Sequence, residues 1–376
     1  MSMIYLSRPS INYREIDSVS KVLNSGWLSS GKKVKELENR FAKYIGVKYA
    51  VSLNSCASAL QLAIQVQGIK GEIILPSFTF AASANAVINS GCLPRFVDIE
   101  YESCNMDYRK VEALINKQTV AIMPVHYAGQ SCNMDKISAI ARKHNLILIE
   151  DSAEAIGAKF KGRQTGSFGI GCFSFFSTKN ITCGEGGMVT TNSRYIRDKV
   201  LAYSSHGIER TSSSKGNPSW LREAKYPGYN YRMANVLAAI AVTQLSKIEI
   251  MNNQRRELAR YLSKNLKECR ELDLPFEDSR CYHVYQMYTI KLKPDNRIKR
   301  DLFVDYLRKK GIEASVHFYP PLHKQKLYQG YLYPQDHLPV TEKVSASIVT
   351  LPLYPKLLKR DLNYVIAKIK KALTKS

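Results

Sequence analysis

Short apolar runs alternate with helix-length segments through the first part of this 376-residue chain. Each run is strand-sized, and several lack a polar face, which is typical of strands buried on both sides of a sheet. Strands separated by helices predict a mostly parallel sheet that is covered by helices, an α/β fold. The predicted strands are residues 49–53, 72–75, 95–98, 120–125, 146–150, 172–176 and 187–191.

The later part of the chain has a different pattern. A long helical periodicity covers residues 234–267, and a helix over 299–310 lies between predicted strands at 285–292 and 313–316. Residues 356–375 have the spacing of an amphipathic helix with a solvated basic face. This second pattern predicts a compact α+β unit.

The chain length suits two units of unequal size. We predict a large α/β unit over residues 1–245 and a smaller carboxyl-terminal α+β unit over residues 246–376. The boundary then falls inside the long helix, which bridges the two units.

Lys179 lies in a turn between two predicted strands. It follows the buried run 172–177 and precedes the glycine-rich sequence 182–187. A lysine held there is a candidate Schiff-base nucleophile. The alternative is a solvated charge, which is the commoner role of a lysine in a polar turn.

Asp151 lies in the polar sequence 150–154, directly after the apolar run 146–149. Functional groups collect at the carboxyl ends of strands in doubly wound folds. An acid there and a lysine just past another strand are the two fixed points of a pyridoxal phosphate site, because the carboxylate keeps the pyridine nitrogen protonated. The alternative for the acid is a helix cap.

Six motifs in a fixed order extend this pattern over most of the chain, from Gly26 to about Pro355. They are residues 76–80, 149–157, 173–180, 184–189, 228–233 and 317–323. With them the chain resembles the DegT/DnrJ/EryC1/StrS family of pyridoxal-phosphate-dependent nucleotide-sugar aminotransferases. The resemblance implies fold type I of the pyridoxal phosphate enzymes, with a mostly parallel mixed sheet between helices and a smaller carboxyl-terminal domain.

The resemblance assigns catalytic roles to individual residues. Lys179 is implied to form the Schiff base with pyridoxal phosphate and to transfer protons, and Asp151 to bind the pyridine nitrogen. Phe80 is implied to stack on the cofactor ring, although an aromatic side chain in a strand-like segment is more often part of the core.

The implied phosphate site combines the Ser174 hydroxyl with the backbone of Ser55, Cys56 and Ala57, where a helix begins. Helix starts offer unpaired N–H groups and a favourable dipole to an anion. The family usually has Ser-Gly-Thr at this turn, so the threonine hydroxyl is missing here. Backbone amides, with Ser58 as a substitute hydroxyl, are expected to bind the phosphate instead.

Glu154, an implied cofactor contact, stands where many family members carry histidine or glutamine. Glutamate there resembles the subgroup of GDP-perosamine synthase, which aminates a 4-keto-6-deoxy sugar. The implied reaction moves an amino group from an amino acid, glutamate by family analogy, to C4 of a nucleotide-linked keto-deoxyhexose, with C3 amination as the alternative. Dehydratases of this fold carry histidine in place of the lysine, so Lys179 favours transamination. Aminated sugars of this kind enter O-antigens, other surface polysaccharides and secondary metabolites.

Other motif residues point to a partner subunit and to the substrate. In the family, the residue matching Asn230 reaches the cofactor phosphate of the neighbouring subunit, which implies a homodimer with shared active sites; the alternative is an ordinary turn residue. His317 and Tyr319 are candidates for substrate binding, and a structural hydrogen-bonding role is equally open for the histidine. Residues 211–227 are predicted to form a loop near the site.

The net charge of +23, from 55 basic and 32 acidic residues, raises a rival class of function. A basic binding or regulatory protein could retain this fold without catalysis and bind nucleic acid. The charges are dispersed, however, and no nucleic-acid-binding motif is visible. A basic surface would also attract a nucleotide diphosphate sugar, so no nucleic-acid partner is expected.

Eight cysteines occur without Cys-x-x-Cys spacing or clustered histidines, which predicts reduced thiols and no metal site. Cys183 lies near Lys179 and would be the acceptor thiol of a lyase such as a cysteine desulfurase, but no neighbouring histidine activates it. No segment is apolar for long enough to span a membrane, and the start of the sequence lacks a secretory signal pattern. A cytoplasmic location is therefore expected.

Overall fold

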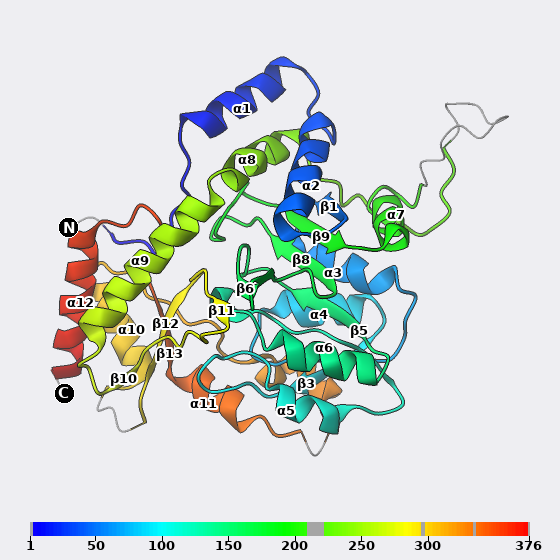
Figure 1. The fold of residues 1–376 in the computed structure, drawn as a ribbon. Helices are drawn as coiled ribbons and strands as arrows, with labels where there is room; N and C mark the ends of the chain where they lie inside the picture. The colour runs from blue at the N-terminus through cyan, green and yellow to red at the C-terminus, as the bar shows by residue number, and fades with distance from the viewer. Residues whose placement is uncertain (1–2, 209–221, 295–297, 334–335, 375–376) are drawn as a thin grey trace.

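The computed structural model describes residues 3–208, 222–294, 298–333 and 336–374 (Figure 1). The greater part of the loop predicted over residues 211–227 lies outside these ranges. Within them, no helix is both long enough and apolar enough to cross a membrane.

The described residues form a central seven-stranded sheet in the order β1-β9-β8-β5-β4-β2-β3. β9 pairs antiparallel with both β1 and β8, and the other neighbours are parallel. The mostly parallel mixed sheet of the predicted α/β class is confirmed, with strand ends shifted by a few residues. The strands are β1 (Tyr49–Leu53), β2 (Glu72–Pro76), β3 (Leu93–Val97), β4 (Thr119–Ile122), β5 (Ile147–Asp151), β8 (Ile170–Ser174) and β9 (Gly187–Thr191).

Helices cover both faces of this sheet because its strands are apolar on both sides. In β2, Ile73 and Leu75 join the core formed with α3, α4 and α7, whereas Ile74 joins the opposite core with α5 and α6. α2 and α8 cover the second face at the β1 end. These helices are α2 (Lys32–Ile45), α3 (Cys56–Gln65), α4 (Ala81–Asn89), α5 (Tyr108–Val111), α6 (Met134–Lys143), α7 (Arg194–Tyr203) and α8 (Asn235–Leu245).

The helical pattern predicted over 234–267 is two helices rather than one. α8 ends at Leu245, and α9 (Ile248–Leu266) begins after Lys247, whose φ of −111° and ψ of 0° depart from helical geometry. The amino-terminal part of α9 packs in the core beside α2 and α8, and its later part packs in a separate core. α9 therefore bridges two cores, and the proposed boundary after residue 245 falls at the break that precedes it.

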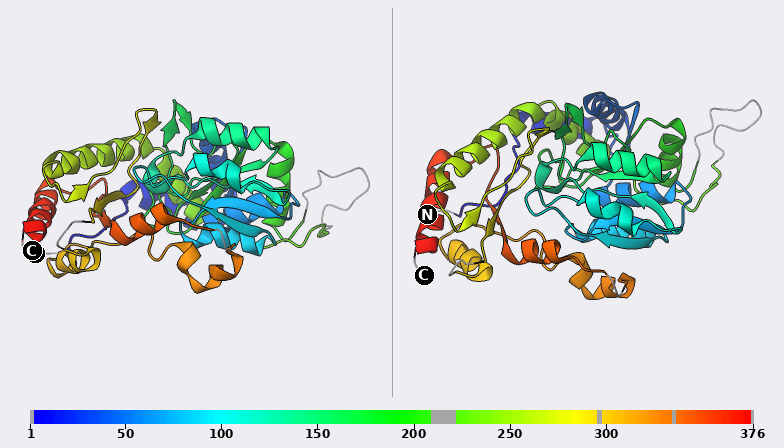
Figure 2. Two further views of the ribbon diagram at one scale, coloured as in Figure 1. Left: turned by 90° about the horizontal axis from the view of Figure 1, so that it is seen from below. Right: turned by 60° about the horizontal axis from the view of Figure 1, so that its bottom comes forward.

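The second core surrounds a three-stranded antiparallel sheet in the order β10-β12-β13. α9, α10 and α12 pack around this sheet, and Figure 2 shows them gathered at one end of the molecule. The predicted apolar face of α12 is buried, as its spacing indicated. The elements are β10 (Leu272–Asp273), β12 (Tyr288–Leu292), β13 (Ile348–Leu351), α10 (Arg300–Lys309) and α12 (Lys359–Thr374).

Two strand predictions in this region were wrong in part. Residues 313–316 form no strand and contribute one bridge, between Ser315 and Thr350. The strand predicted from residue 285 begins at Tyr288, because the backbone of residues 284–286 bonds to residues 128 and 129 instead. β13, which pairs with β12, was not predicted.

The amino-terminal segment belongs to this second core. Ile4 N donates to Gly311 O at 2.8 Å, Ile4 O accepts from Glu313 N at 2.9 Å, and Leu353 N donates to Leu6 O at 3.2 Å. The Ile4 side chain is buried there. The remaining elements are α1 (Tyr13–Asn24), α11 (Pro339–Ser347), β6 (Lys159–Phe160), β7 (Arg163–Gln164), β11 (Cys281–Tyr282) and four short 3₁₀ segments, residues 112–114, 127–129, 322–324 and 326–331.

Candidate active site

A cavity of about 480 Å³ lies at the carboxyl ends of β5 and β8, beside residues of the second core. It brings together residues that are far apart in the sequence. The predicted site residues that line it are Ser55, Cys56, Ala57, Phe80, Asp151, Glu154, Ser174, Lys179 and His317.

Asp151 is the last residue of β5 and is 4% exposed. Its Oδ2 accepts from Ser83 Oγ at 2.7 Å and its Oδ1 accepts from Ala153 N at 3.1 Å. Burial raises the pKa of Asp151, and these two hydrogen bonds oppose the rise. A buried carboxylate at a cavity wall is stabilised by a cationic ligand, and a protonated pyridine nitrogen is such a group.

Ser83 was not identified from the sequence. It lies in the first turn of α4, after Phe80, the residue that precedes that helix. The sequence signal that could have identified Ser83 is the polar pair Ser77 and Thr79 with the aromatic Phe80, directly before a helix start.

Lys179 follows β8 in a turn, where its N–H donates to Phe176 O at 3.0 Å. Its Nζ lies 3.4 Å from Glu154 Oε1, and both side chains are largely buried. The other oxygen, Glu154 Oε2, accepts from Ala128 N at 2.9 Å. The carboxylate is thus held at one end and faces the lysine amine with the other.

The start of α3 forms one wall of the cavity. Ser55 caps the helix, with its Oγ accepting from Ser58 N at 3.1 Å, so the amides of Cys56 and Ala57 precede the first bonded turn. Such amides bind anions. Ser58 does not line the cavity, because its hydroxyl is directed to Asn54 Oδ1 at 2.7 Å. The structure therefore places backbone amides, and not the Ser58 hydroxyl, at this wall.

Gly187 allows this wall to form. A Cβ atom at position 187 would lie 2.2 Å from Ser55 O and 2.6 Å from Cys56 N. Only glycine lets the start of β9 approach the first turn of α3 so closely.

Phe80 and Ser174 complete the predicted cofactor wall. Phe80 is 65% exposed, although large aromatic side chains are normally buried, and its ring lies 6.3 Å from the Phe318 ring. Ser174, the last residue of β8, is buried with its Oγ accepting from Phe176 N at 3.3 Å. An exposed ring face on a cavity wall is suited to stacking on a flat ligand.

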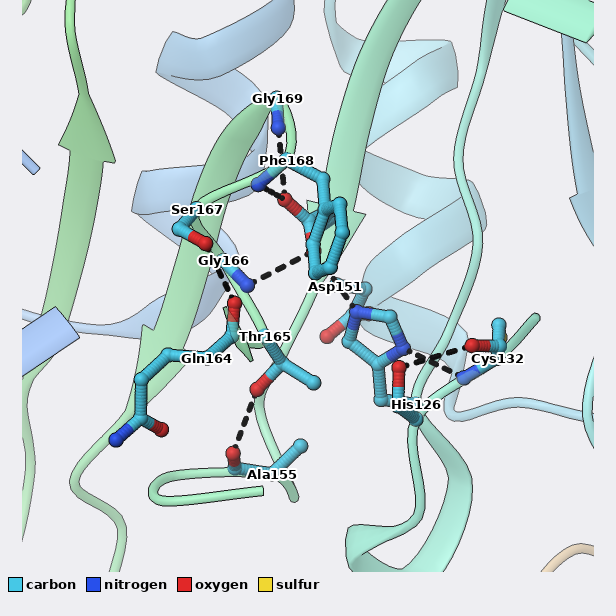
Figure 3. Close-up of polar contacts among 12 residues, drawn as sticks. His126, Cys132, Asp151, Ala155, Gln164, Thr165, Gly166, Ser167, Phe168 and Gly169 are labelled. Carbon is cyan, nitrogen blue, oxygen red and sulfur yellow. Dashed lines mark hydrogen bonds and ion pairs between the residues drawn. The ribbon is translucent and has the colours of Figure 1, made fainter. Parts of the chain in front are cut away.

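Glu150, the neighbour of Asp151 on β5, has a structural role, and Figure 3 labels its hydrogen-bond partners His126, Gly166, Phe168 and Gly169. Its Oε1 accepts from the amides of Phe168 and Gly169 at 2.7 and 2.8 Å, and its Oε2 accepts from Gly166 N at 2.8 Å. His126 Nδ1 accepts from Cys132 N at 3.1 Å, so its Nε2 carries the proton that bonds to Glu150 at 3.1 Å. Glu150 thereby links the turn of residues 166–169 to His126, while Asp151 faces the cavity.

The candidate substrate-binding residues differ in their position relative to the cavity. His317 lines the cavity, and its Nδ1 lies 2.9 Å from Thr350 Oγ1; burial lowers the pKa of this histidine. Tyr319 is 59% exposed beside Arg300 and is not part of the lining. His323, in the same motif, bonds to Ser77 Oγ at 2.7 Å and lies in the protein interior.

Asn230 is exposed and does not line the cavity. Its backbone pairs with that of Ser205. Its role at the cofactor of a neighbouring subunit stays a prediction.

The second core supplies a wall that the sequence did not predict. Gln286 and Met287 precede β12, and Thr350, Leu351 and Leu353 lie in or after β13. These residues share no motif with the catalytic segment, so only the folded chain brings them to it.

Cys183 does not support a lyase. It is 3% exposed, its thiol donates to Glu185 O at 3.1 Å, and burial raises its pKa to about 12. A mobile, reactive acceptor thiol requires the opposite properties. Among the described residues, no group of three or more metal-binding side chains occurs.

The cavity fits pyridoxal phosphate on physical grounds. A lysine amine, a buried carboxylate, an exposed ring and a helix start with unpaired amides match the aldehyde, ring nitrogen, ring face and phosphate of that cofactor. Together with the mostly parallel sheet, they define a pyridoxal-phosphate-dependent enzyme of fold type I.

The comparisons with known proteins identify the family. Residues 9–370 match the model of the DegT/DnrJ/EryC1/StrS aminotransferase family. The chain is 39% identical to the uncharacterized protein MJ1066 of Methanocaldococcus jannaschii, over 98% of this chain and 97% of that one. It is 36% identical to the spore coat polysaccharide biosynthesis protein SpsC of Bacillus subtilis, over 97% and 95% of the two chains.

Two similar solved structures are sugar-related aminotransferases. Helicobacter pylori PseC, an aminotransferase involved in pseudoaminic acid biosynthesis, has a TM-score of 0.93 and 28% identity, with 99% of both chains covered. The putative sugar aminotransferase Spr1654 of Streptococcus pneumoniae, in its PMP form, has a TM-score of 0.93 and 27% identity, also over 99% of both chains. The present chain belongs to the DegT/DnrJ/EryC1/StrS family, and it is a pyridoxal-phosphate-dependent aminotransferase.

Proposed function

We propose that this protein transfers an amino group from L-glutamate to C4 of a nucleotide-linked 4-keto-6-deoxyhexose. One observation carries the proposal: Lys179 Nζ faces Glu154 in the same cavity that Asp151 lines. The names of SpsC and PseC, which refer to polysaccharide and pseudoaminic acid biosynthesis, support a sugar substrate. Glutamate at position 154 supports C4 over C3.

Each side chain has a defined task in this proposal. Bound pyridoxal phosphate supplies an electron sink for the carbon that loses a proton. Asp151 holds a proton on the ring nitrogen, since a buried carboxylate favours a cationic partner. Lys179 accepts a proton at Nζ and returns it, and Glu154 orients that amine.

The remaining residues bind the cofactor and the substrate. Phe80 offers its ring face, and Ser174 with the amides of Cys56 and Ala57 holds the phosphate. His317 faces the sugar side of the cavity with its ring fixed by Thr350.

We further propose a homodimer with shared active sites. Among the described residues that line the cavity, the Asp, Glu, Lys and Arg side chains are Asp151, Glu154, Glu185 and Lys179. A diphosphate substrate and a dicarboxylate donor need additional cations. Basic side chains gather around a separate cavity of about 960 Å³, lined in part by Arg194, Arg197, Arg232, Lys32 and Lys35.

A complementation experiment tests the shared site. Lys179→Ala and Asn230→Ala chains, each weakly active alone, are co-expressed at equal levels. Half of the resulting dimers are hybrids with one intact site, so about one quarter of the wild-type activity is expected to return. Activity that stays at the level of the separate variants would contradict a site built from both subunits.

The reaction itself is tested by visible absorbance. The protein with bound cofactor is mixed with L-glutamate and then with a panel of nucleotide-linked 4-keto and 3-keto sugars. Loss of the visible band with glutamate, and its return with a 4-keto sugar alone, is the expected result. Return with 3-keto sugars only would reassign the position to C3, and a band untouched by every amino donor would refute the proposed transfer.

A further inference from the structure

A short segment of the second core, residues 284–286, passes between two loops of the active site. On one side, Val284 N donates to Gly129 O at 3.0 Å and Gln286 N donates to Ala128 O at 2.9 Å. On the other side, Gln286 Nε2 donates to Thr178 O at 3.2 Å, and Val284 O accepts from Asn180 Nδ2 at 3.2 Å. The segment therefore contacts both neighbours of Lys179 in the chain.

The contact with Thr178 acts directly on the backbone of the lysine. Thr178 O belongs to the peptide group whose nitrogen is Lys179 N, and that N–H donates to Phe176 O at 3.0 Å. The peptide plane is thus held at both of its polar atoms. Its orientation sets the direction in which the Lys179 side chain leaves the backbone.

The contact with Ala128 acts on the carboxylate that faces the lysine. Ala128 has a φ of 54°, which is unusual for a residue with a Cβ. In this conformation its N–H donates to Glu154 Oε2 at 2.9 Å, while its carbonyl accepts from Gln286 N. Gln286 consequently lies between the two members of the Lys179–Glu154 pair and is bonded toward each.

Arg255 holds the segment in place from α9. This side chain is 2% exposed, and its Nη1 donates to the carbonyls of Tyr285 and Gln286 at 3.3 Å and of Leu353 at 2.9 Å. A buried guanidinium that bonds to three main-chain carbonyls restricts the movement of all three.

The two polar atoms of the Gln286 side chain differ in their hydrogen bonding. Gln286 is 7% exposed and lines the cavity. Nε2 is directed to Thr178, whereas Oε1 is buried without a hydrogen-bond partner among the described residues. Replacing Nε2 by an atom that cannot donate therefore removes the hydrogen bond to Thr178 O. It breaks no hydrogen bond of Oε1 within the described residues, because Oε1 makes none there.

We propose that Gln286 is a positioning residue for Lys179: its carboxamide fixes the Thr178–Lys179 peptide so that Nζ stays opposite Glu154. The kinetic consequence rests on the proposed function, because a misdirected amine transfers protons slowly. The positioning itself is a property of the folded chain and is measurable without turnover.

Hydrogen exchange of the full-length protein without cofactor tests the positioning. Gln286→Met and Gln286→Glu both remove the donor, and the second keeps the shape of the side chain in case the first does not fold. The Lys179 amide is expected to exchange about fivefold faster in both, the ratio that corresponds to one average hydrogen bond. Unchanged exchange in a folded variant overturns the inference.

Gln244→Met is the matched control. Gln244 is also a buried glutamine whose Nε2 donates to a main-chain carbonyl, Ser10 O at 3.1 Å, and in addition to Glu15 Oε1 at 2.8 Å. It lies on α8 and does not line the cavity. It is expected to leave exchange at Lys179 unchanged. An equal acceleration in Gln244→Met would show a general loss of stability and would overturn the specific role of Gln286.

Turnover separates this inference from the proposed function. In the holoenzyme, the Gln286 variants are expected to lower kcat about tenfold, with the KM for the amino donor within about twofold of wild type, since a small misplacement acts on the chemical step. A tenfold rise in KM with kcat unchanged would overturn positioning in favour of direct substrate binding. Faster exchange in a protein that aminates no keto sugar supports the inference and refutes the proposed function.

Discussion

The two walls of the cavity differ in what they contribute. The wall formed by β5, β8 and the start of α3, called the sheet wall below, contains the ionisable side chains of Asp151, Glu154 and Lys179. The wall formed by the second core supplies apolar side chains, neutral hydrogen-bonding groups and the ring of His317. In the proposed function, the sheet wall therefore performs the chemistry, and the second wall sets geometry and substrate fit.

Of the variants that test this division, Lys179→Ala is expected to have the largest effect. Removal of the amine abolishes both nucleophile and proton carrier, so kcat is expected to fall by about 10⁴-fold or more. Steady-state kinetics with a saturating amino donor measures the loss. Lys143→Ala, which removes an exposed lysine paired with Glu112 at 2.6 Å, is the control and is expected to retain full activity. Substantial activity in Lys179→Ala would move the chemistry away from the sheet wall.

Gly187→Ala tests the architecture of the same wall. The added Cβ meets backbone atoms of Ser55 and Cys56, which cannot move independently of β9 and α3. We expect a loss of about 3 kcal/mol in the free energy of unfolding, with weaker cofactor binding. Denaturant titration and cofactor titration measure both. Gly330→Ala, where no atom lies within 4 Å of the added Cβ, is the control; equal losses in the two variants would argue against the close approach.

Thr350→Val tests the second wall. It removes the partner of His317 Nδ1 while preserving side-chain shape. The KM for the keto sugar is expected to rise about fivefold to tenfold with little change in kcat, since the ring loses one hydrogen bond. Thr243→Val removes a similar hydroxyl contact within α8 and should leave both constants unchanged. A fall in kcat alone would place His317 in the chemistry rather than in substrate fit.

Asp151→Asn has the smallest expected effect, on the stability of the cofactor-free protein. Because burial raises the pKa of Asp151 in the folded state, stability from this group is present below the unfolded pKa and is lost as pH rises through the folded pKa. The asparagine mimics the protonated acid, so the melting temperature near pH 7 is expected to rise by roughly 1–3 °C. Thermal unfolding should show this gain shrinking toward about pH 4. A destabilised variant near pH 7 would contradict the direction of the pKa shift.

The sequence predicted the sheet wall because its residues lie next to strong local patterns. Asp151 and Lys179 each follow an apolar run, and runs of that kind mark strand ends. The strands of the central sheet were found for the same reason, with boundary errors of a few residues. Asn230 and Tyr319 remain predictions, since neither lines the cavity of the single chain.

Long-range contacts were outside the reach of local patterns. Ser83 bonds to Asp151 across 68 positions of sequence, and Gln286 bonds to Thr178 across 108. β13 was missed because its four residues follow α11 without a break. Residues 313–316 were overpredicted because their only strand pairing within the described residues is one bridge, between Ser315 and Thr350. Periodicity reports which face of an element is buried, but not which distant residue meets it.

The docking of the amino-terminal segment has a consequence for protein synthesis. Leu6 and Ser7 line the active-site cavity, yet Leu6 is held by Glu313, which is made 307 positions later, and by Leu353. During translation the central sheet can fold before the second core is made, because all seven of its strands lie within residues 49–191. The catalytic cavity cannot be closed at that stage. A chain that ends before residue 313 would therefore carry Lys179 and Asp151 in an open cavity that lacks its amino-terminal wall.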